Sequence, residues 1–178
     1  MQKVKTGFTL IELLVVVLII GVLTAIALPQ YNIAVIKSRT ATMLPILKNL
    51  AEAQEVYYMN NGRYAGKISE LDIQLPNSCS HVDHASYDSS ERGELIKCDE
   101  FFLIDNDGNG MSINANYCPQ NNTSWSTCSP NRDFQIAFRL AHRDSLYSGE
   151  GNKRYCAVYN QKLGKQICSA FGGLEYKN

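Results

Sequence analysis

The longest apolar run of the chain lies close to its N-terminal end. Residues 8–28 are apolar except for Thr9, Glu12, Gly21 and Thr24. A helix rises about 1.5 Å per residue, so this run is long enough to cross a hydrocarbon core of about 30 Å. The pattern predicts a membrane-spanning helix over residues 8–28.

A second helical pattern follows the first without a gap. Apolar side chains recur at spacings of three, four and seven residues to about Met59, and the sequence Asn-Asn-Gly at 60–62 is a stop signal. Pro29 and Pro45 each remove a helical hydrogen bond and predict an interruption or bend. We therefore predict an amphipathic half over residues 29–59, joined to the apolar half in one rod.

The pattern changes to a period of two after residue 93. Residues 60–93 form a loop region in which one turn of helix is expected at Ser69–Asp72. Alternating apolar and polar residues then predict strands with one buried face and one exposed face. The expected strands are residues 94–98, 101–105, 111–117, 133–140, 154–160 and 166–172. An antiparallel sheet over residues 94–178, packed on the C-terminal half of the rod, gives an α+β fold shaped like a lollipop.

All six cysteines lie beyond the apolar helix. They are Cys79, Cys98, Cys118, Cys128, Cys156 and Cys168. An even number behind an exported segment, with no CxxC pair, favours disulfides over a zinc site. The sequence leaves the connectivity open, and pairing in chain order is the simplest hypothesis. The last pair supports it, because a hairpin folded about Lys162, with Gly164 beside its loop, sets Cys156 opposite Cys168.

The composition limits the partners of the chain. The 178 residues are 45% hydrophobic and 19% charged, which indicates one domain of ordinary size plus an appendage. Lys and Arg together number 17, as do Asp and Glu, so no global basic field attracts nucleic acid. We expect no nucleic-acid partner.

A short acidic segment follows the second expected strand. Asp105, Asp107 and Asn109, with Gly110 next, fit the first half of an EF-hand loop, in which oxygen ligands precede a glycine. The twelfth position is Asn116 rather than Glu, so the bidentate ligand is missing. A hairpin turn rich in Gly, Asn and Asp explains the segment equally well. Calcium binding at these three residues is the one metal hypothesis that the sequence suggests, and no other cofactor is expected.

The sequence SCSHVDH at residues 78–84 also contains metal-binding residue types. Its spacing fits no strong metal template, and Cys79 is expected to be oxidised. We interpret the segment as a polar surface loop.

A second group resembles the parts of a hydrolase. His142, Asp144 and Ser145 are residue types of a catalytic triad, but neighbours in sequence rarely converge and no G-x-S-x-G elbow is present. We predict no catalytic residue and no enzyme activity. Trp125 is either an exposed contact residue or part of the packing in its own loop.

Glu12 is the one ionisable side chain within residues 8–28. A charged group well inside a bilayer costs several kcal/mol, so it normally has a partner and a role. A secretory signal peptide cleaved near Ala25–Ala27 is one alternative, although its apolar core is usually about 7–15 residues. A plain single-pass anchor is another, although it leaves Glu12 without a partner.

A cut between Gly7 and Phe8 gives Glu12 a partner. Phe8 then carries an α-amino group with an ordinary pKa near 7.7–8.0. Glu12 lies four residues further on, on the same helical face and in the first turn, where the helix dipole favours a carboxylate. The acid can therefore pair with its own amine or with that of a neighbour.

The stretch GFTLIELLVV at residues 7–16 follows a short leader that carries Lys3 and Lys5 and no acid, and Pro29 is soon followed by Tyr31. Positive charge before an apolar run places that end in the cytoplasm. Together these features closely resemble the N-terminus of type IV pilins and of the pseudopilins of type II secretion. The resemblance is strong over the first third of the chain and looser in the following loop.

This resemblance implies a prepilin leader over residues 1–7, removed after Gly7 by the prepilin peptidase, and N-methylation of Phe8 by the same enzyme. In this family the matching glutamate neutralises the terminal amine of an adjacent subunit in the filament core, a role that falls on Glu12. Pro29 matches the position near which the helix loosens in assembled filaments. Major pseudopilins bind calcium in their C-terminal part, although none of their specific motifs is matched here.

The resulting prediction is a structural protomer of a type IV pilus. Its partners are then further copies of itself in a helical filament, the prepilin peptidase, and the pilus or secretion assembly machinery in the inner membrane. The precursor spans the inner membrane with its N-terminus in the cytoplasm, and the assembled form is a surface pilus or a periplasmic pseudopilus. The alternatives are a type II secretion pseudopilin and a membrane-tethered binding protein that never polymerises.

Overall fold

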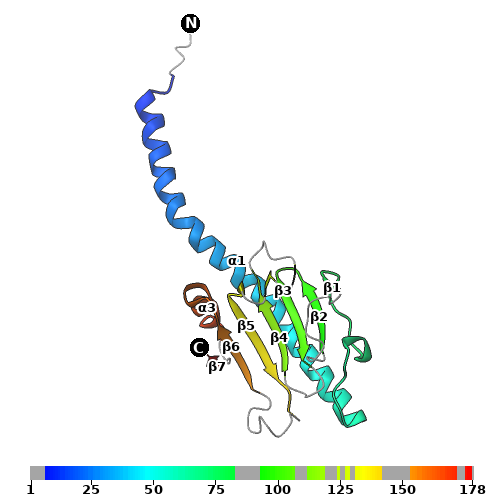
Figure 1. The fold of residues 1–178 in the computed structure, drawn as a ribbon. Coiled ribbons are helices and arrows are strands. Elements are labelled where there is room, and N and C mark those ends of the chain that lie inside the picture. Colours follow the sequence, from blue (N-terminus) through cyan, green and yellow to red (C-terminus); the bar gives the residue numbers. More distant parts are fainter. Residues whose placement is uncertain are drawn as a thin grey trace.

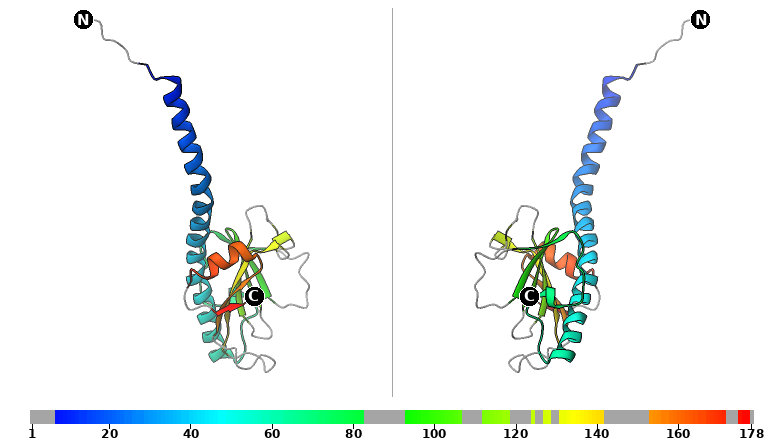
Figure 2. Two further views of the ribbon diagram at one scale, coloured as in Figure 1. Left: turned by 90° about the vertical axis from the view of Figure 1, so that its left-hand side faces the viewer. Right: turned by 90° about the vertical axis from the view of Figure 1, so that its right-hand side faces the viewer.

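In the described part of the chain, the fold is built on one long helix and one sheet, with the shorter helices η1 and α3 beside them (Figure 1). The computed structural model describes residues 7–82, 93–106, 112–118, 124, 127–128, 131–141, 153–171 and 175–177. In both views of Figure 2 the N-terminal half of the helix extends well away from the sheet, and the C-terminal half lies against it. The α+β fold predicted from the sequence is confirmed.

Helix α1 spans Leu10–Asn61. It ends at Gly62, which has a φ of 68° and whose N–H donates a hydrogen bond to the carbonyl oxygen of Tyr58. A positive φ suits glycine because it has no Cβ, so the Asn-Asn-Gly stop signal acts as expected. The helix continues without a break through Pro29 and Pro45. Neither proline ends α1, because each removes only one donor while the neighbouring hydrogen bonds persist.

Among the described residues the sheet has seven strands, which lie side by side in chain order. They are β1 (Cys79–His81), β2 (Gly93–Cys98), β3 (Phe101–Asn106), β4 (Ser112–Tyr117), β5 (Phe134–Arg139), β6 (Arg154–Val158) and β7 (Glu175–Lys177). Strands β1 to β6 are antiparallel to their neighbours, and β7 pairs parallel to β6. The strands expected between residues 94 and 160 are thereby confirmed, and the expected helical turn is the 3₁₀ helix η1 (Ile68–Glu70).

The expected strand at 166–172 is wrong. Helix α3 (Gln161–Cys168) occupies most of that segment, and the side chain of Asn160 caps it by accepting from the N–H groups of Lys162 and Leu163. A helix here also explains the parallel strand β7, because parallel neighbours need a crossover connection rather than a hairpin. The few apolar residues of this short segment fit the period of two of a strand as well as the period of about 3.6 of a helix. Periodicity alone therefore does not distinguish the two.

The core lies between the C-terminal half of α1 and one face of the sheet. The helix contributes buried Met43, Leu47 and Leu50. Each side chain of this kind gains about 1.5–3 kcal/mol from full burial. Gln54 is also fully buried, and its amide forms two hydrogen bonds with the backbone of Ala65. These contacts fix the start of the loop region against the helix.

Three disulfides connect the cysteines in chain order. They are Cys79–Cys98, Cys118–Cys128 and Cys156–Cys168, and no described cysteine is free. The first joins directly opposed residues of β1 and β2. The last joins β6 to α3, so the expected partners are correct although the expected hairpin is not.

Candidate assembly site at the start of α1

The N-terminus of α1 is a capping box formed by Thr9 and Glu12. The Thr9 N–H and hydroxyl both donate to Oε2 of Glu12, at 2.8 and 2.5 Å, and the Glu12 N–H donates to the Thr9 hydroxyl at 3.4 Å. This arrangement satisfies backbone donors that have no partner within the helix. Glu12 therefore stabilises the first turn of the single chain before any second copy is present.

Both capping bonds to the carboxylate converge on a single oxygen. Oε2 of Glu12 accepts from Thr9 twice, whereas Oε1 has no hydrogen-bond partner within the described part of the chain. A carboxylate has lone pairs on both oxygens, so Oε1 can accept from a cation while the cap stays in place. The geometry thus leaves half of the carboxylate available for a neighbour.

Gly7 and Phe8 lie just before the helix and are both exposed. Phe8 is 80% exposed. A Cβ added at Gly7 meets no atom within 4 Å, and Gly7 does not have the positive φ that favours glycine. Neither packing nor backbone conformation in the described chain therefore requires glycine at this position.

The rest of the apolar half presents a continuous hydrophobic surface. Every residue from Gly7 to Asn32 is exposed, and this part of α1 is long and apolar enough to cross a membrane, judged by length and composition. The hydroxyl of Thr24 donates to the carbonyl oxygens of Ile20 and Gly21, so it adds no free donor to this surface. An exposed apolar surface of this size indicates a partner, either lipid or protein.

The sequence analysis identified Glu12 and missed its interaction with Thr9. The signal was present, because Ser or Thr followed three residues later by Glu before an apolar run is the sequence pattern of a capping box. The structure does not test the cut after Gly7, the methylation of Phe8 or the pairing of Glu12 between subunits. These remain predictions.

The metal hypothesis receives no test. Strand β3 runs through Asp105, whereas Asp107 and Asn109 lie outside the described residues. Among the residues that the structure does describe, no group of three His, Cys, Asp or Glu side chains could hold a metal ion. Calcium therefore remains a prediction.

The structure describes only some residues of the other candidate groups. In the SCSHVDH segment Cys79 is in a disulfide, and Nδ1 of His81 lies 2.6 Å from Oε1 of Glu94. Asp83 and His84 lie outside the described residues. So do the four residues His142, Asp144, Ser145 and Trp125.

Comparison with known proteins identifies the N-terminal pattern. The family described as "Prokaryotic N-terminal methylation motif" matches residues 2–28. The chain is 31% identical over 78 residues to "Type IV major pilin protein PilE1" of Neisseria gonorrhoeae, which covers 44% of this chain and 47% of the relative. It is 35% identical over 73 residues to a "Fimbrial protein" of Neisseria meningitidis serogroup B (strain ATCC BAA-335 / MC58), covering 41% and 43%.

A third relative is "Type IV major fimbrial protein FimA" of Dichelobacter nodosus, 39% identical over 67 residues, covering 38% of this chain and 42% of the relative. Over its N-terminal part the chain is therefore similar to type IV pilins and fimbrial proteins. This pilin-like protein spans less than half the length of the curated relatives that it matches. No solved structure matches it significantly.

Proposed function

We propose that this pilin-like protein is a structural protomer that polymerises into a type IV pilus filament after cleavage after Gly7 and methylation of Phe8. The observation that carries the proposal is the exposed apolar half of α1, which begins with a carboxylate whose Oε1 has no partner in the described chain. The methylation motif and the fimbrial relatives support it.

The physics of assembly explains the need for a charge. Moving an apolar helix from lipid into a bundle of like helices exchanges apolar contacts for apolar contacts, so the hydrophobic gain is small. Close packing and a specific charge pair then have to supply both affinity and register. Removing one partner of such a pair costs about 3–5 kcal/mol when the pair is buried, because it leaves a buried charge uncompensated.

Cleavage supplies the positive partner. The new α-amino group of Phe8 has an ordinary pKa near 7.7–8.0, so it is largely cationic at neutral pH. Oε1 of Glu12 can accept from the amine of an adjacent copy while Oε2 keeps its bonds to Thr9. Head-to-tail contacts of this kind that do not close into a ring produce an open helical filament.

The processing enzyme accounts for Gly7. Because the described chain gives no packing or conformational reason for glycine there, the requirement is best placed in a partner that must reach the backbone closely. We assign that role to the prepilin peptidase. The uncut precursor then spans the inner membrane through the apolar half of α1, with the leader in the cytoplasm and the sheet on the other side.

The test compares filaments from cells that express the wild-type chain, Glu12→Gln or Glu52→Gln. Glu12→Gln keeps a carbonyl acceptor for the cap but removes the charge, so we expect filament yield to fall at least tenfold. Glu52→Gln removes a charge from an exposed part of α1 and should leave the yield unchanged. N-terminal sequencing should find methylated Phe8 in all three, which separates assembly from processing.

Normal filaments from Glu12→Gln would contradict the proposed role of the charge. A mature chain that begins at Leu28 would instead support a signal peptide. A non-polymerising tether predicts no filaments from any of the three chains, and a pseudopilin predicts filaments confined to the periplasm.

A further inference from the structure

The apolar half of α1 is held at one end only. Residues 7–32 are exposed along their whole length, Ile33 is the first side chain packed against the core, and Thr40 is the first that is fully buried. The direction of the exposed half is therefore set by the first contacts of the packed half with the sheet.

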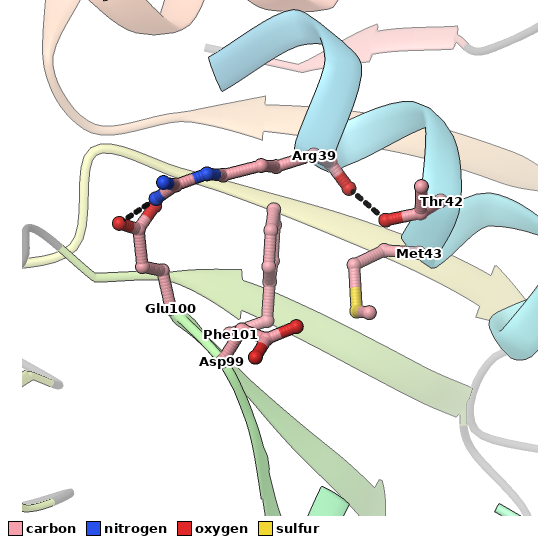
Figure 3. Close-up of a pocket in the computed structure, with 6 residues that line it drawn as sticks. All are labelled: Arg39, Thr42, Met43, Asp99, Glu100 and Phe101. Atoms are coloured by element: carbon pink, nitrogen blue, oxygen red, sulfur yellow. Dashed lines mark hydrogen bonds and ion pairs between the residues drawn. The ribbon is translucent and has the colours of Figure 1, made fainter. Parts of the chain in front are cut away.

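One of these contacts is an ion pair between residues 61 positions apart. Nη1 of Arg39 on α1 donates to Oε1 of Glu100, which lies in the tight turn between β2 and β3 (Figure 3). The Glu100 side chain is only 12% exposed and that of Arg39 is 44% exposed. Asp99 precedes Glu100 in this turn, and Figure 3 shows its carboxylate pointing away from the pair.

A cavity of about 450 Å³ separates the helix from the turn at this point. Buried Met43 and Phe101 line it together with Thr42 and the ion pair. Across this opening the ion pair joins α1 to the turn, beside the buried side chains of Met43 and Phe101. Oε2 of Glu100 is buried and has no hydrogen-bond partner in the described chain, so loss of Arg39 leaves this carboxylate without any partner.

Several contacts fix the position of this turn relative to the sheet. Cys98, just before it, is in the disulfide to β1, and Phe101, just after it, packs its ring against that of Tyr117 at 5.3 Å between centroids. The carbonyl oxygen of Glu100 also accepts from the N–H of Cys118. If the ion pair breaks, we therefore expect the exit end of α1, rather than the turn, to change its position.

A small tilt of α1 at Arg39 produces a large displacement at Glu12. The two residues are 27 positions apart, which corresponds to about 40 Å of helix, so a tilt of about 10° displaces Glu12 by about 7 Å. That displacement exceeds the separation of about 4 Å at which a charge pair is effective. The direction of the helix thus decides whether Glu12 reaches the amine of an adjacent copy.

We propose that Arg39 and Glu100 are a positioning pair that fixes the direction in which α1 leaves the sheet and so aligns Glu12 for assembly. This inference rests on the proposed function of the chain as a filament protomer. The pair acts through the helix and does not itself touch the neighbouring copy at Glu12.

The first test measures the direction of the helix in the single, full-length chain in lipid nanodiscs. Spin labels on cysteines introduced at Val17 and Lys162, both exposed, report the distance between the apolar half and the sheet domain. We expect a narrow distance distribution for the wild type and a clearly broader one for Arg39→Glu. The double variant with Arg39→Glu and Glu100→Arg should recover the narrow distribution, because it restores the pair with reversed charges.

Lys48→Ala is the matched control, because it breaks the exposed Lys48–Glu52 pair on the same helix, further from the point of exit. It should leave the distribution unchanged. High salt should broaden the wild-type distribution, since the pair is partly exposed and therefore screened. A narrow distribution in Arg39→Glu, or no recovery in the double variant, would overturn the proposal.

The second test measures filament yield in cells. We expect a fall of about tenfold for Arg39→Glu and recovery in the double variant, while processing at Phe8 continues in both. Normal filaments from Arg39→Glu overturn the positioning role. If Glu12→Gln also assembles normally, the proposed function itself fails, and the label distances still show whether the pair sets the helix direction.

Discussion

At Gly164 the backbone of α3 lies close to β6 and to the residue just before β5. A Cβ at this position would lie 2.8 Å from Cγ1 of Val158 and 2.9 Å from the carbonyl oxygen of Asp133. The second atom belongs to the backbone and cannot rotate away, so Gly164→Ala should destabilise the fold by about 1–3 kcal/mol. Chemical unfolding measures this difference, with Lys165→Ala on the exposed face of α3 as the control. Equal stability of the two variants would contradict the close approach.

A second prediction at this scale concerns pH. The Tyr57 hydroxyl donates to Oε2 of Glu70 at 2.8 Å, and Arg63 lies 3.4 Å from the same oxygen. The hydrogen bond from Tyr57 lowers the pKa of Glu70 below its ordinary 4.5, and the bond to Glu70 raises the pKa of Tyr57 above its ordinary 10.0. A lowered acid pKa contributes stability that is present above 4.5 and lost as pH falls through the folded pKa.

Glu70→Gln should therefore be less stable than the wild type at pH 7, and the difference should shrink as the pH falls below 4.5. At alkaline pH the raised pKa of Tyr57 makes stability fall, rather than rise, with increasing pH. Its contribution is complete below 10 and is lost as the pH rises through the folded pKa. Unfolding measured from pH 3 to 7 tests the first part, with Glu52→Gln as the control. A difference that stays constant over this range would contradict it.

At the scale of elements, α3 depends on its N-cap. The Asn160 side-chain oxygen accepts from two N–H groups of the first turn, and its amide donates to Oδ1 of Asp133 at 2.6 Å. Asn160→Ala removes both the cap and the bond to Asp133 and should lower the free energy of unfolding by about 1 kcal/mol or more. Asn160→Ser keeps a capping oxygen but loses the donor to Asp133, so it should lie between Ala and the wild type in unfolding experiments. If Asn160→Ser and Asn160→Ala lose the same stability, the hydrogen bond to Asp133 accounts for the whole loss and the cap for none of it.

The elements differ in how far the sequence alone predicts them. The long helix and the strands between residues 94 and 160 follow from sustained periodicity and clear stop signals such as Gly62. Strands β1 and β7 have three residues each, which is too short for a pattern to be visible. Helix α3 depends on a cap and on a tertiary contact at Gly164, and neither is apparent from alternation alone. At the candidate site, the sequence singles out Glu12 but not the free Oε1, because that detail depends on side-chain geometry.

At the scale of the whole molecule, stability and assembly belong to different halves of α1. The core uses residues from Ile33 onwards, together with the sheet and its three disulfides. The half before Ile33 makes no contact that buries any of its residues. The apolar surface of that half therefore contributes to partners and not to the folding of the single chain.

This separation predicts the behaviour of a chain that begins at Asn32. It loses the exposed apolar half of α1 and none of the buried core, so it should remain monomeric and soluble without detergent. Its unfolding midpoint should match that of the full-length protein in detergent within about 2 °C, because distant and independent regions contribute additively. Sedimentation and thermal unfolding check the two parts, and in this shortened chain Gly164→Ala should still destabilise. Aggregation, or a much lower midpoint, would show that the apolar half takes part in the fold after all.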